Sequence, residues 1–207
     1  MSKPSRAGFS LILLAALVSS PARAQCDPAA RPFPLPHLDA ALASHALSLL
    51  VLAPMSQYGA DTGRDDGSLA FRIEAALRAQ RPDLAIDLDT MDNAGQTVAE
   101  MLPALAGRLA HTPVSLVVWQ AGTAEIFRAV PVATASAALA DAVHLLAIND
   151  ADLILIDPDP SLDPEPQYRE IETSLAQTAL REGVALYQQR SGGDCTSHGV
   201  ARLIARP

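Results

Sequence analysis

The chain has 207 residues, and its 23 acidic side chains outnumber 15 basic ones, which gives a net charge of −8 at neutral pH. This balance disfavours nucleic acid and anionic membrane as partners, because both require a basic protein surface. The length suits a single domain with a buried core.

Residues 1–24 have the pattern of a cleaved export signal. Lys3 and Arg6 precede an apolar run from Phe9 to Val18, and the segment ends in Ala22-Arg23-Ala24, which fits the Ala-x-Ala cleavage pattern. The run is too short to span a bilayer as a stable helix. We therefore expect signal cleavage, no membrane span in the mature chain, and a periplasmic or secreted location.

The mature chain would start at Gln25 and keep 12 basic and 23 acidic residues, for a net charge of −11. Its two cysteines, Cys26 and Cys195, lie near opposite ends. Exported proteins fold in an oxidising compartment where disulfides persist. A bond between these cysteines would close almost the whole chain into a loop and stabilise the fold by about 4–5 kcal/mol in the simple entropic treatment. We predict this disulfide; a lipid anchor on Cys26 is the alternative.

After a proline-rich stretch over residues 27–37, apolar runs alternate with helical patterns. We assign residues 25–44 to an N-terminal arm, extended over the proline-rich part. The predicted strands are Leu47–Ala53, Leu84–Leu88, Val114–Gln120, Leu153–Ile156 and Val184–Tyr187. The predicted helices are Leu69–Ala79, Thr97–Leu109 with a Thr97…Glu100 capping box, Ala133–Ile148, Tyr168–Arg181 and a short His198–Ala205. This alternation predicts one α/β domain over residues 45–207, with about five parallel strands in a three-layer, flavodoxin-like fold.

In such sheets the functional site lies beyond the carboxyl ends of the strands. An acidic, proline-rich loop with Asp157, Asp159 and Asp163 follows the fourth strand. It could be a calcium loop, but its prolines oppose tight chelation, which favours a solvated loop. Scattered histidines and two cysteines also disfavour a transition-metal site, so we expect no metal and no cofactor. Trp119, on the third strand, is expected to pack in the core.

The segment from Val117 to Glu125 runs from an apolar strand through a glycine turn to an acid. It resembles the third conserved block of the SGNH/GDSL hydrolases, a strand followed by Gly-x-Asn-Asp. Gly122 keeps the glycine position, Ala124 stands at the Asn position and Glu125 at the Asp position. The resemblance implies the SGNH fold, and it implies that the side chain that helps to bind the oxyanion is missing.

The first block of the family, a strand followed by Gly-Asp-Ser-x-Thr-x-Gly, resembles Val51 to Gly59. Aligning the last glycine on Gly59 places Met55 at the nucleophilic serine, and Ser56 comes one position late. The second block, a glycine-rich turn that offers a backbone N–H to the oxyanion, resembles Asp92 to Thr97, where Gly95 is its last glycine.

The fourth block is Asp-x-x-His-Pro before a glycine and the last helix. Anchored on Gly199, it places Ser191 and Asp194 at the Asp and His positions, while His198 is displaced. A shifted triad remains open, with Ser56 as nucleophile, His198 as base, and Asp194 or Asp157 as the group that orients it. The alternative is that Ser56 is a solvated loop serine and His198 caps a helix.

The resemblance implies an exported SGNH-like protein, ancestrally an esterase acting on cell-envelope carbohydrate or lipid esters, with its usual catalytic residues replaced. The alternative is a non-catalytic periplasmic protein that binds a ligand or a partner. A small ester or a carbohydrate is the expected ligand. The expected pocket residues are Met55, Asp92, Asn93, Gly122 and Glu125.

Overall fold

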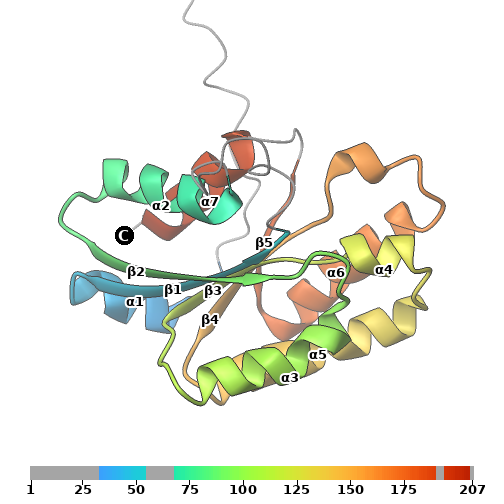
Figure 1. The fold of residues 1–207 in the computed structure, drawn as a ribbon, viewed down its shortest axis with the longest axis horizontal. Helices are drawn as coiled ribbons and strands as arrows, with labels where there is room; N and C mark the ends of the chain where they lie inside the picture. Colours follow the sequence, from blue (N-terminus) through green and yellow to red (C-terminus); the bar gives the residue numbers. More distant parts are fainter. Residues whose placement is uncertain (1–32, 55–67, 190–193, 206–207) are drawn as a thin grey trace, which may run out of the picture.

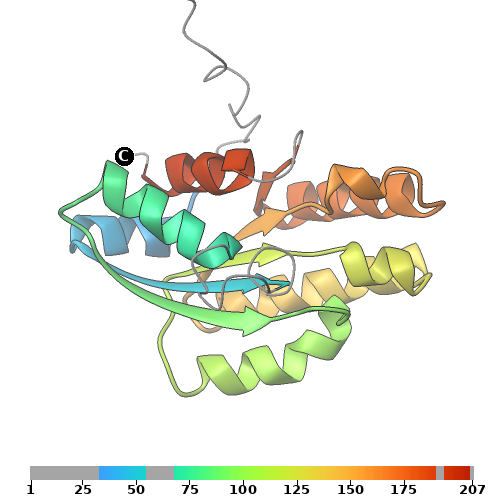
Figure 2. The same ribbon diagram turned by 45° about the horizontal axis from the view of Figure 1, so that its top comes forward.

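A computed structural model describes residues 33–54, 68–189 and 194–205. They form one five-stranded, all-parallel sheet with strand order β2-β1-β3-β4-β5 (Figures 1 and 2). The strands are β1 (Ala46–Ala53), β2 (Ala85–Asp92), β3 (Leu116–Gln120), β4 (Asp152–Ile156) and β5 (Ala185–Tyr187). The α/β fold predicted from the sequence is confirmed.

Helices cover both faces of the sheet. They are α1 (Pro36–Ala43), α2 (Leu69–Gln80), α3 (Val98–Leu109), α4 (Thr123–Phe127), α5 (Val132–Ala147), α6 (Tyr168–Glu182) and α7 (Asp194–Ala205), with a short 3-10 turn at Pro160–Leu162. One apolar cluster joins α3, α5 and α6 to Leu50, Leu52, Val117 and Trp119, and a second joins α1, α2 and α7 to Leu49, Val51 and Val118. Alternate residues of the central strands therefore serve opposite layers.

Two sequence predictions about single residues are confirmed. Trp119 is 1% exposed in the first cluster. Thr97 and Glu100 form a reciprocal capping box at the start of α3. Strand β2 extends four residues beyond the predicted Leu88, because all eight of its residues pair with β1 as far as Asp92 opposite Ala53.

The sequence pattern did not predict helix α1, which lies inside the segment assigned to the arm. Pro36 stands at its first turn, where a missing N–H costs nothing. Leu38 and Leu42 are buried, and the Leu38 N–H donates to Asp152 Oδ2 at 2.8 Å. The end of the arm is therefore part of the domain core.

Helix α7 begins at Asp194, four residues earlier than predicted. Gly199 lies inside this helix, and a Cβ there would come within 2.4 Å of the Tyr187 ring. No helix in the described part of the chain is long and apolar enough to cross a membrane.

Candidate site at the carboxyl edge of the sheet

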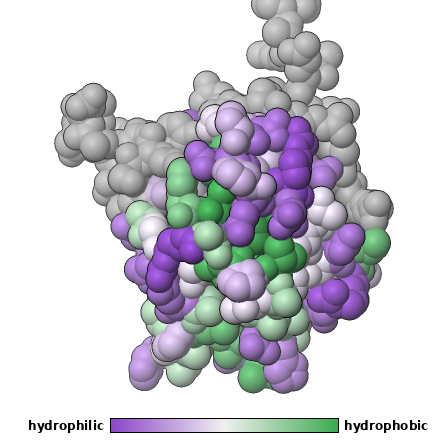
Figure 3. All heavy atoms as spheres, turned by 90° about the vertical axis from the view of Figure 1, so that its right-hand side faces the viewer, coloured by the Kyte–Doolittle hydropathy of each residue, from purple (hydrophilic) through white to green (hydrophobic). Residues whose placement is uncertain are grey.

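All five strands end at the same edge of the sheet, on the right of Figure 1. Figure 3 views the molecule from that side and shows apolar side chains in the middle of the face, surrounded by hydrophilic ones. Asn93, Gln120, Asp157 and Gln189 follow or end four of the strands, and all four are at least nine-tenths buried. Buried polar groups at this edge are the signal expected of a functional site in an open α/β sheet.

The turn after β3 is tightly packed. Gly122 has φ 99°, in the left-handed region, and is the residue before α4. A Cβ at this position would lie 2.6 Å from Pro158 Cγ and 2.8 Å from Leu175 Cδ1. Only glycine therefore fits, both because of the backbone angle and because the β4 loop and α6 pack directly against it.

Beside this turn lies a hollow of about 20 Å³, enough for roughly one water molecule. Its walls come from the ends of β1 and β3, from the loop between β2 and α3, and from the start of α4. The lining residues are Pro54, Asn93, Gly95, Gln96, Val98, Trp119, Gln120, Ala121, Gly122, Thr123, Ala124 and Glu125.

Asn93 is the residue of this hollow with unused hydrogen-bonding capacity. It is 7% exposed, and its Nδ2 donates to the Gln120 carbonyl at 2.8 Å. A carbonyl only accepts, which fixes the amide orientation and makes the other atom an oxygen. That Oδ1 is buried and has no partner. A buried acceptor without a partner costs about 1–3 kcal/mol, so a donor on a bound water or ligand would relieve it.

Glu125 makes a structural hydrogen bond. It is 3% exposed, and its Oε1 accepts from the Val98 N–H at 2.6 Å. Val98 is the first residue of α3, so the carboxylate satisfies one of the free N–H groups at the helix start. Ala124 next to it is also buried and offers no side-chain donor. The third block therefore holds helices together here.

Asp157, at the end of β4, forms a second polar cluster. It is 1% exposed, its Oδ1 accepts from the Gln189 N–H at 2.7 Å, and its Oδ2 is buried with no partner. The Gln189 amide donates to the Asp157 carbonyl at 2.5 Å and accepts from Thr196 Oγ1 at 3.1 Å. These bonds connect the ends of β4 and β5 to the first turn of α7.

Burial raises the pKa of Asp157 to about 7, opposed by the Gln189 hydrogen bond and supported by the nearby Glu172 carboxylate. Burial also raises the pKa of Tyr168 to about 12, again with a contribution from Glu172. A carboxyl that titrates near neutral pH at this edge is a candidate functional group. The prediction of a solvated acidic loop is wrong for Asp157, because the residue continues a buried strand.

The structure brings together three of the five predicted pocket residues, Asn93, Gly122 and Glu125. Asp92 is exposed at the end of β2, where its Oδ1 accepts from the Ala94 N–H. Met55 lies outside the described residues.

The predicted catalytic residues are only partly described. Ser56 and Ser191 lie outside the described residues. Asp194 is the first residue of α7, and His198 is exposed one turn later on the same helix. The predicted disulfide stays a prediction, because Cys26 lies outside the described residues. The residues in the described part of the chain contain no group of three or more His, Cys, Asp or Glu that could hold a metal.

Sequence reasoning missed Gln120 and Gln189 and gave Asp157 only a secondary role. The signal that could have found them is simple: each is a polar residue directly at the end of, or just beyond, a buried apolar run.

Several solved structures share this architecture. An alpha/beta hydrolase enzyme from the metagenome of Lake Arreo, Spain, has a TM-score of 0.61 and 17% identity over 77% of this chain and 94% of that one. An acetylxylan esterase from Geobacillus stearothermophilus has a TM-score of 0.59 and 14% identity, over 76% and 94% of the two chains. An SGNH-hydrolase family esterase has a TM-score of 0.56 and 20% identity, over 68% and 75%.

These identities are low, so the likeness establishes the fold alone. No curated protein matches the sequence. Residues 21–190, most of the chain, match the Non-GDSL lipase-like family. The chain therefore belongs to the Non-GDSL lipase-like family, and its fold is that of the SGNH hydrolases.

Proposed function

We propose that this protein is exported and binds a small hydroxyl-bearing ligand, a carbohydrate or its ester, at the carboxyl edge of the sheet, without ordinary SGNH ester hydrolysis. The observation that carries the proposal is the polarity of the hollow beside β3. Its Asn93 Oδ1 is a buried acceptor with no partner. Such an atom suits a ligand that brings an O–H or N–H group.

Ester hydrolysis needs the opposite polarity, because donors must face the oxyanion of the tetrahedral intermediate. Ala124 has no donor in its side chain, and one of the two N–H groups of the Asn93 amide already donates to the Gln120 carbonyl. Loss of a single oxyanion donor costs about 100- to 1000-fold in turnover. Met55 at the aligned nucleophile position supports the same proposal, since a thioether cannot form an acyl-enzyme.

The ligand class rests on two supports. A lone acceptor in a hollow with room for one oxygen atom fits a hydroxyl better than an apolar acyl group. The acetylxylan esterase is a structural relative whose name refers to a carbohydrate ester. The SGNH-like ancestry of the chain also favours cell-envelope carbohydrate or lipid esters as the class from which its ligand derives.

Hydrolysis is tested with p-nitrophenyl acetate and a serine-directed phosphonate on the purified mature chain. We expect no turnover above the buffer rate and no covalent labelling. Ser56→Ala is compared with Ser161→Ala, which removes an exposed serine on the same edge. Turnover that Ser56→Ala abolishes and Ser161→Ala leaves intact would establish an esterase that uses the shifted triad.

Binding is tested by calorimetry with xylo-oligosaccharide and acetylated xylo-oligosaccharide. Asn93→Leu should weaken binding by about tenfold, the equivalent of one lost hydrogen bond of about 1.4 kcal/mol. Asn149→Leu is the matched control, because Asn149 also donates to a backbone carbonyl, Leu145 O at 2.7 Å, but lies in the turn that leads into β4. If neither sugar binds, or if Asn93→Leu has no effect, the ligand proposal is wrong.

Export is tested by the state of the cysteines in protein recovered from the cell envelope. We expect no titratable thiol before reduction and two after it, with Cys26 bonded to Cys195. Two reactive thiols in the native exported protein would contradict the predicted disulfide. A retained signal segment would contradict export by cleavage.

A further inference from the structure

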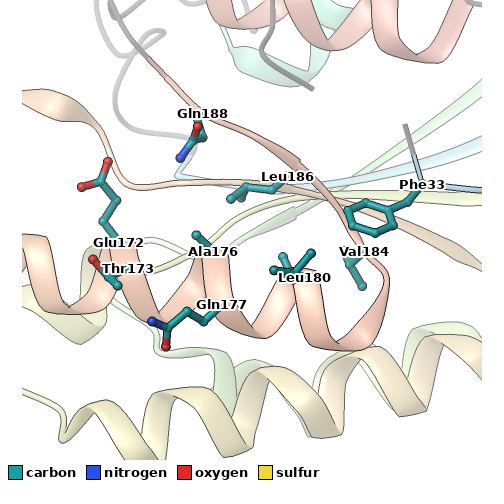
Figure 4. A pocket seen from close by; sticks show the side chains of 10 residues that line it. Phe33, Glu172, Thr173, Ala176, Gln177, Leu180, Val184, Leu186 and Gln188 are labelled. Carbon is teal, nitrogen blue, oxygen red and sulfur yellow. The ribbon is translucent and has the colours of Figure 1, made fainter. Parts of the chain in front are cut away.

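A second hollow lies between α6 and β5, and its lining shares no residue with the hollow beside β3. Strand β5 is the last in the sheet order, so among the described residues no strand pairs with its outer side. The hollow has a volume of about 380 Å³, within the range of small-molecule pockets. Figure 4 shows the side chains that line it.

The lining changes in character along its length. Phe33, Leu180, Val184 and Leu186 line one end (Figure 4). Glu172 and Gln188 line the other. Glu172 and Leu180 are eight residues apart on α6, so the hollow runs for about 12 Å along the helix.

The apolar end of the hollow includes an exposed leucine. Leu180 is 52% exposed and is one of three large hydrophobic side chains that are exposed among the described residues. It lies directly at the hollow, beside the partly buried Leu186. A ligand with an apolar chain would remove this surface from water, at about 25 cal/mol for each Å².

The polar end is electronegative. Among the described residues that line the hollow, Glu172 is the only ionisable one, and its ion pair with Arg169 is long, at 3.4 Å. Arg169 pairs more closely with Asp163, at 2.6 Å. A cation at this end would therefore be favoured by the Glu172 carboxylate.

We propose that the hollow between α6 and β5 binds a single-chain amphiphile, with its alkyl chain against Leu180 and Leu186 and a cationic head at Glu172. This inference does not depend on the proposed function of the carboxyl edge. The ligand class follows from the order of the lining: apolar surface of alkyl-chain length ending at a weakly paired carboxylate.

The test uses three probes with the same chain: decyltrimethylammonium, decyl maltoside and decyl sulfate, each below its micelle concentration, titrated calorimetrically into the full mature protein. We expect the cation to bind about tenfold more tightly than the anion, corresponding to about 1.4 kcal/mol. Glu172→Gln should reduce this ratio to about twofold without weakening the neutral probe.

Leu180→Gln should weaken all three probes about fivefold, because it removes apolar contact surface only. Ile148→Gln is the matched control, since Ile148 is 65% exposed at the end of α5 and does not line this hollow. Both substitutions are at exposed positions, and unchanged thermal unfolding would show that the variants are folded.

Three outcomes would overturn the proposal. The first is no binding of any probe. The second is equal binding of cation and anion, or equal effects of Leu180→Gln and Ile148→Gln. The third is a concentration-dependent dimer in sedimentation that Leu180→Gln dissociates, which would assign the hollow to a second copy of the chain.

Discussion

The ends of β3 and β4 are neighbours in the sheet, and each is followed by a buried acid, but the two acids differ in their hydrogen bonds. Glu125, after β3, is held by the first N–H of α3. Asp157, after β4, has one bonded oxygen and one without a partner, and its pKa is raised to about 7. The acid after β3 therefore serves a structural hydrogen bond, whereas the acid after β4 keeps one carboxyl oxygen free to accept a further hydrogen bond.

This difference shows that resemblance to a family block and unused hydrogen-bonding capacity fall on different residues of this edge. The third block keeps the family glycine, but its acid, Glu125, accepts from the first N–H of α3. The unused capacity lies at Asp157 and Asn93, which no conserved block marked as reactive. At this edge of the sheet, how closely a segment resembles a family block does not tell which residues can still accept a hydrogen bond.

The strongest test of the β3 turn is Gly122→Ala. The added Cβ would meet Pro158 and Leu175 at 2.6 and 2.8 Å, and the residue keeps φ 99°. Overpacking and left-handed strain together should lower the free energy of unfolding by about 4 kcal/mol. Urea denaturation measures the change. Gly95→Ala is the control: its φ is 70° but nothing lies within 4 Å of the added Cβ, so about 1 kcal/mol is expected. Equal losses for the two variants would refute the packing argument.

The next test concerns the β4 end and its dependence on pH. Because the pKa of Asp157 rises from 3.8 to about 7 on folding, the folded state favours the neutral acid. The wild-type protein therefore loses stability as pH rises from about 4 to about 7, and Asp157→Asn escapes this loss. Relative to wild type, the variant should gain about 3–4 kcal/mol between pH 4 and pH 8.

The measurement is urea denaturation of both proteins across that pH range. Asp159→Asn serves as the control, because Asp159 is partly exposed in the same loop. A pH-independent difference between Asp157→Asn and wild type would show that the carboxyl is ionised throughout and that its burial costs little.

The smallest expected effect tests whether Glu125 stabilises the fold through its hydrogen bond to Val98. Glu125→Ala leaves the buried Val98 N–H without its acceptor and should cost about 2 kcal/mol, whereas Glu125→Gln keeps an acceptor and should cost much less. Glu100→Ala, which removes the exposed half of the capping box, should cost less than Glu125→Ala. Chemical denaturation ranks the three. A loss for Glu125→Gln equal to that for Glu125→Ala would point to the charge itself.

The fold was accessible from the sequence because its signals are local. Apolar runs such as Leu47–Ala53 and the Thr97…Glu100 capping box depend on neighbours within one element. Helix α1 was not predicted, because it is short and starts directly after prolines, and its N-terminal Leu38 N–H is satisfied by the distant Asp152.

The candidate site was only partly accessible for the same reason. The Gly122 turn and Asn93 stand in recognisable blocks, so their positions could be predicted. What those groups do depends on long-range partners: Gln120 for Asn93, Val98 for Glu125, and Gln189 for Asp157. The spacing of residues in the sequence does not show that only one carboxyl oxygen of Asp157 would have a partner, or that Glu125 would accept from Val98.

The close approach of Gly122 to Pro158 and Leu175 also bears on how conserved glycines are used to recognise enzymes. A side chain is excluded here by the walls of the domain itself, so selection for folding alone retains the glycine. The same turn would therefore be kept by proteins of this fold whether or not they hydrolyse an ester. Searches that weight this glycine detect shared architecture, and evidence of turnover has to come from the atoms that face the ligand.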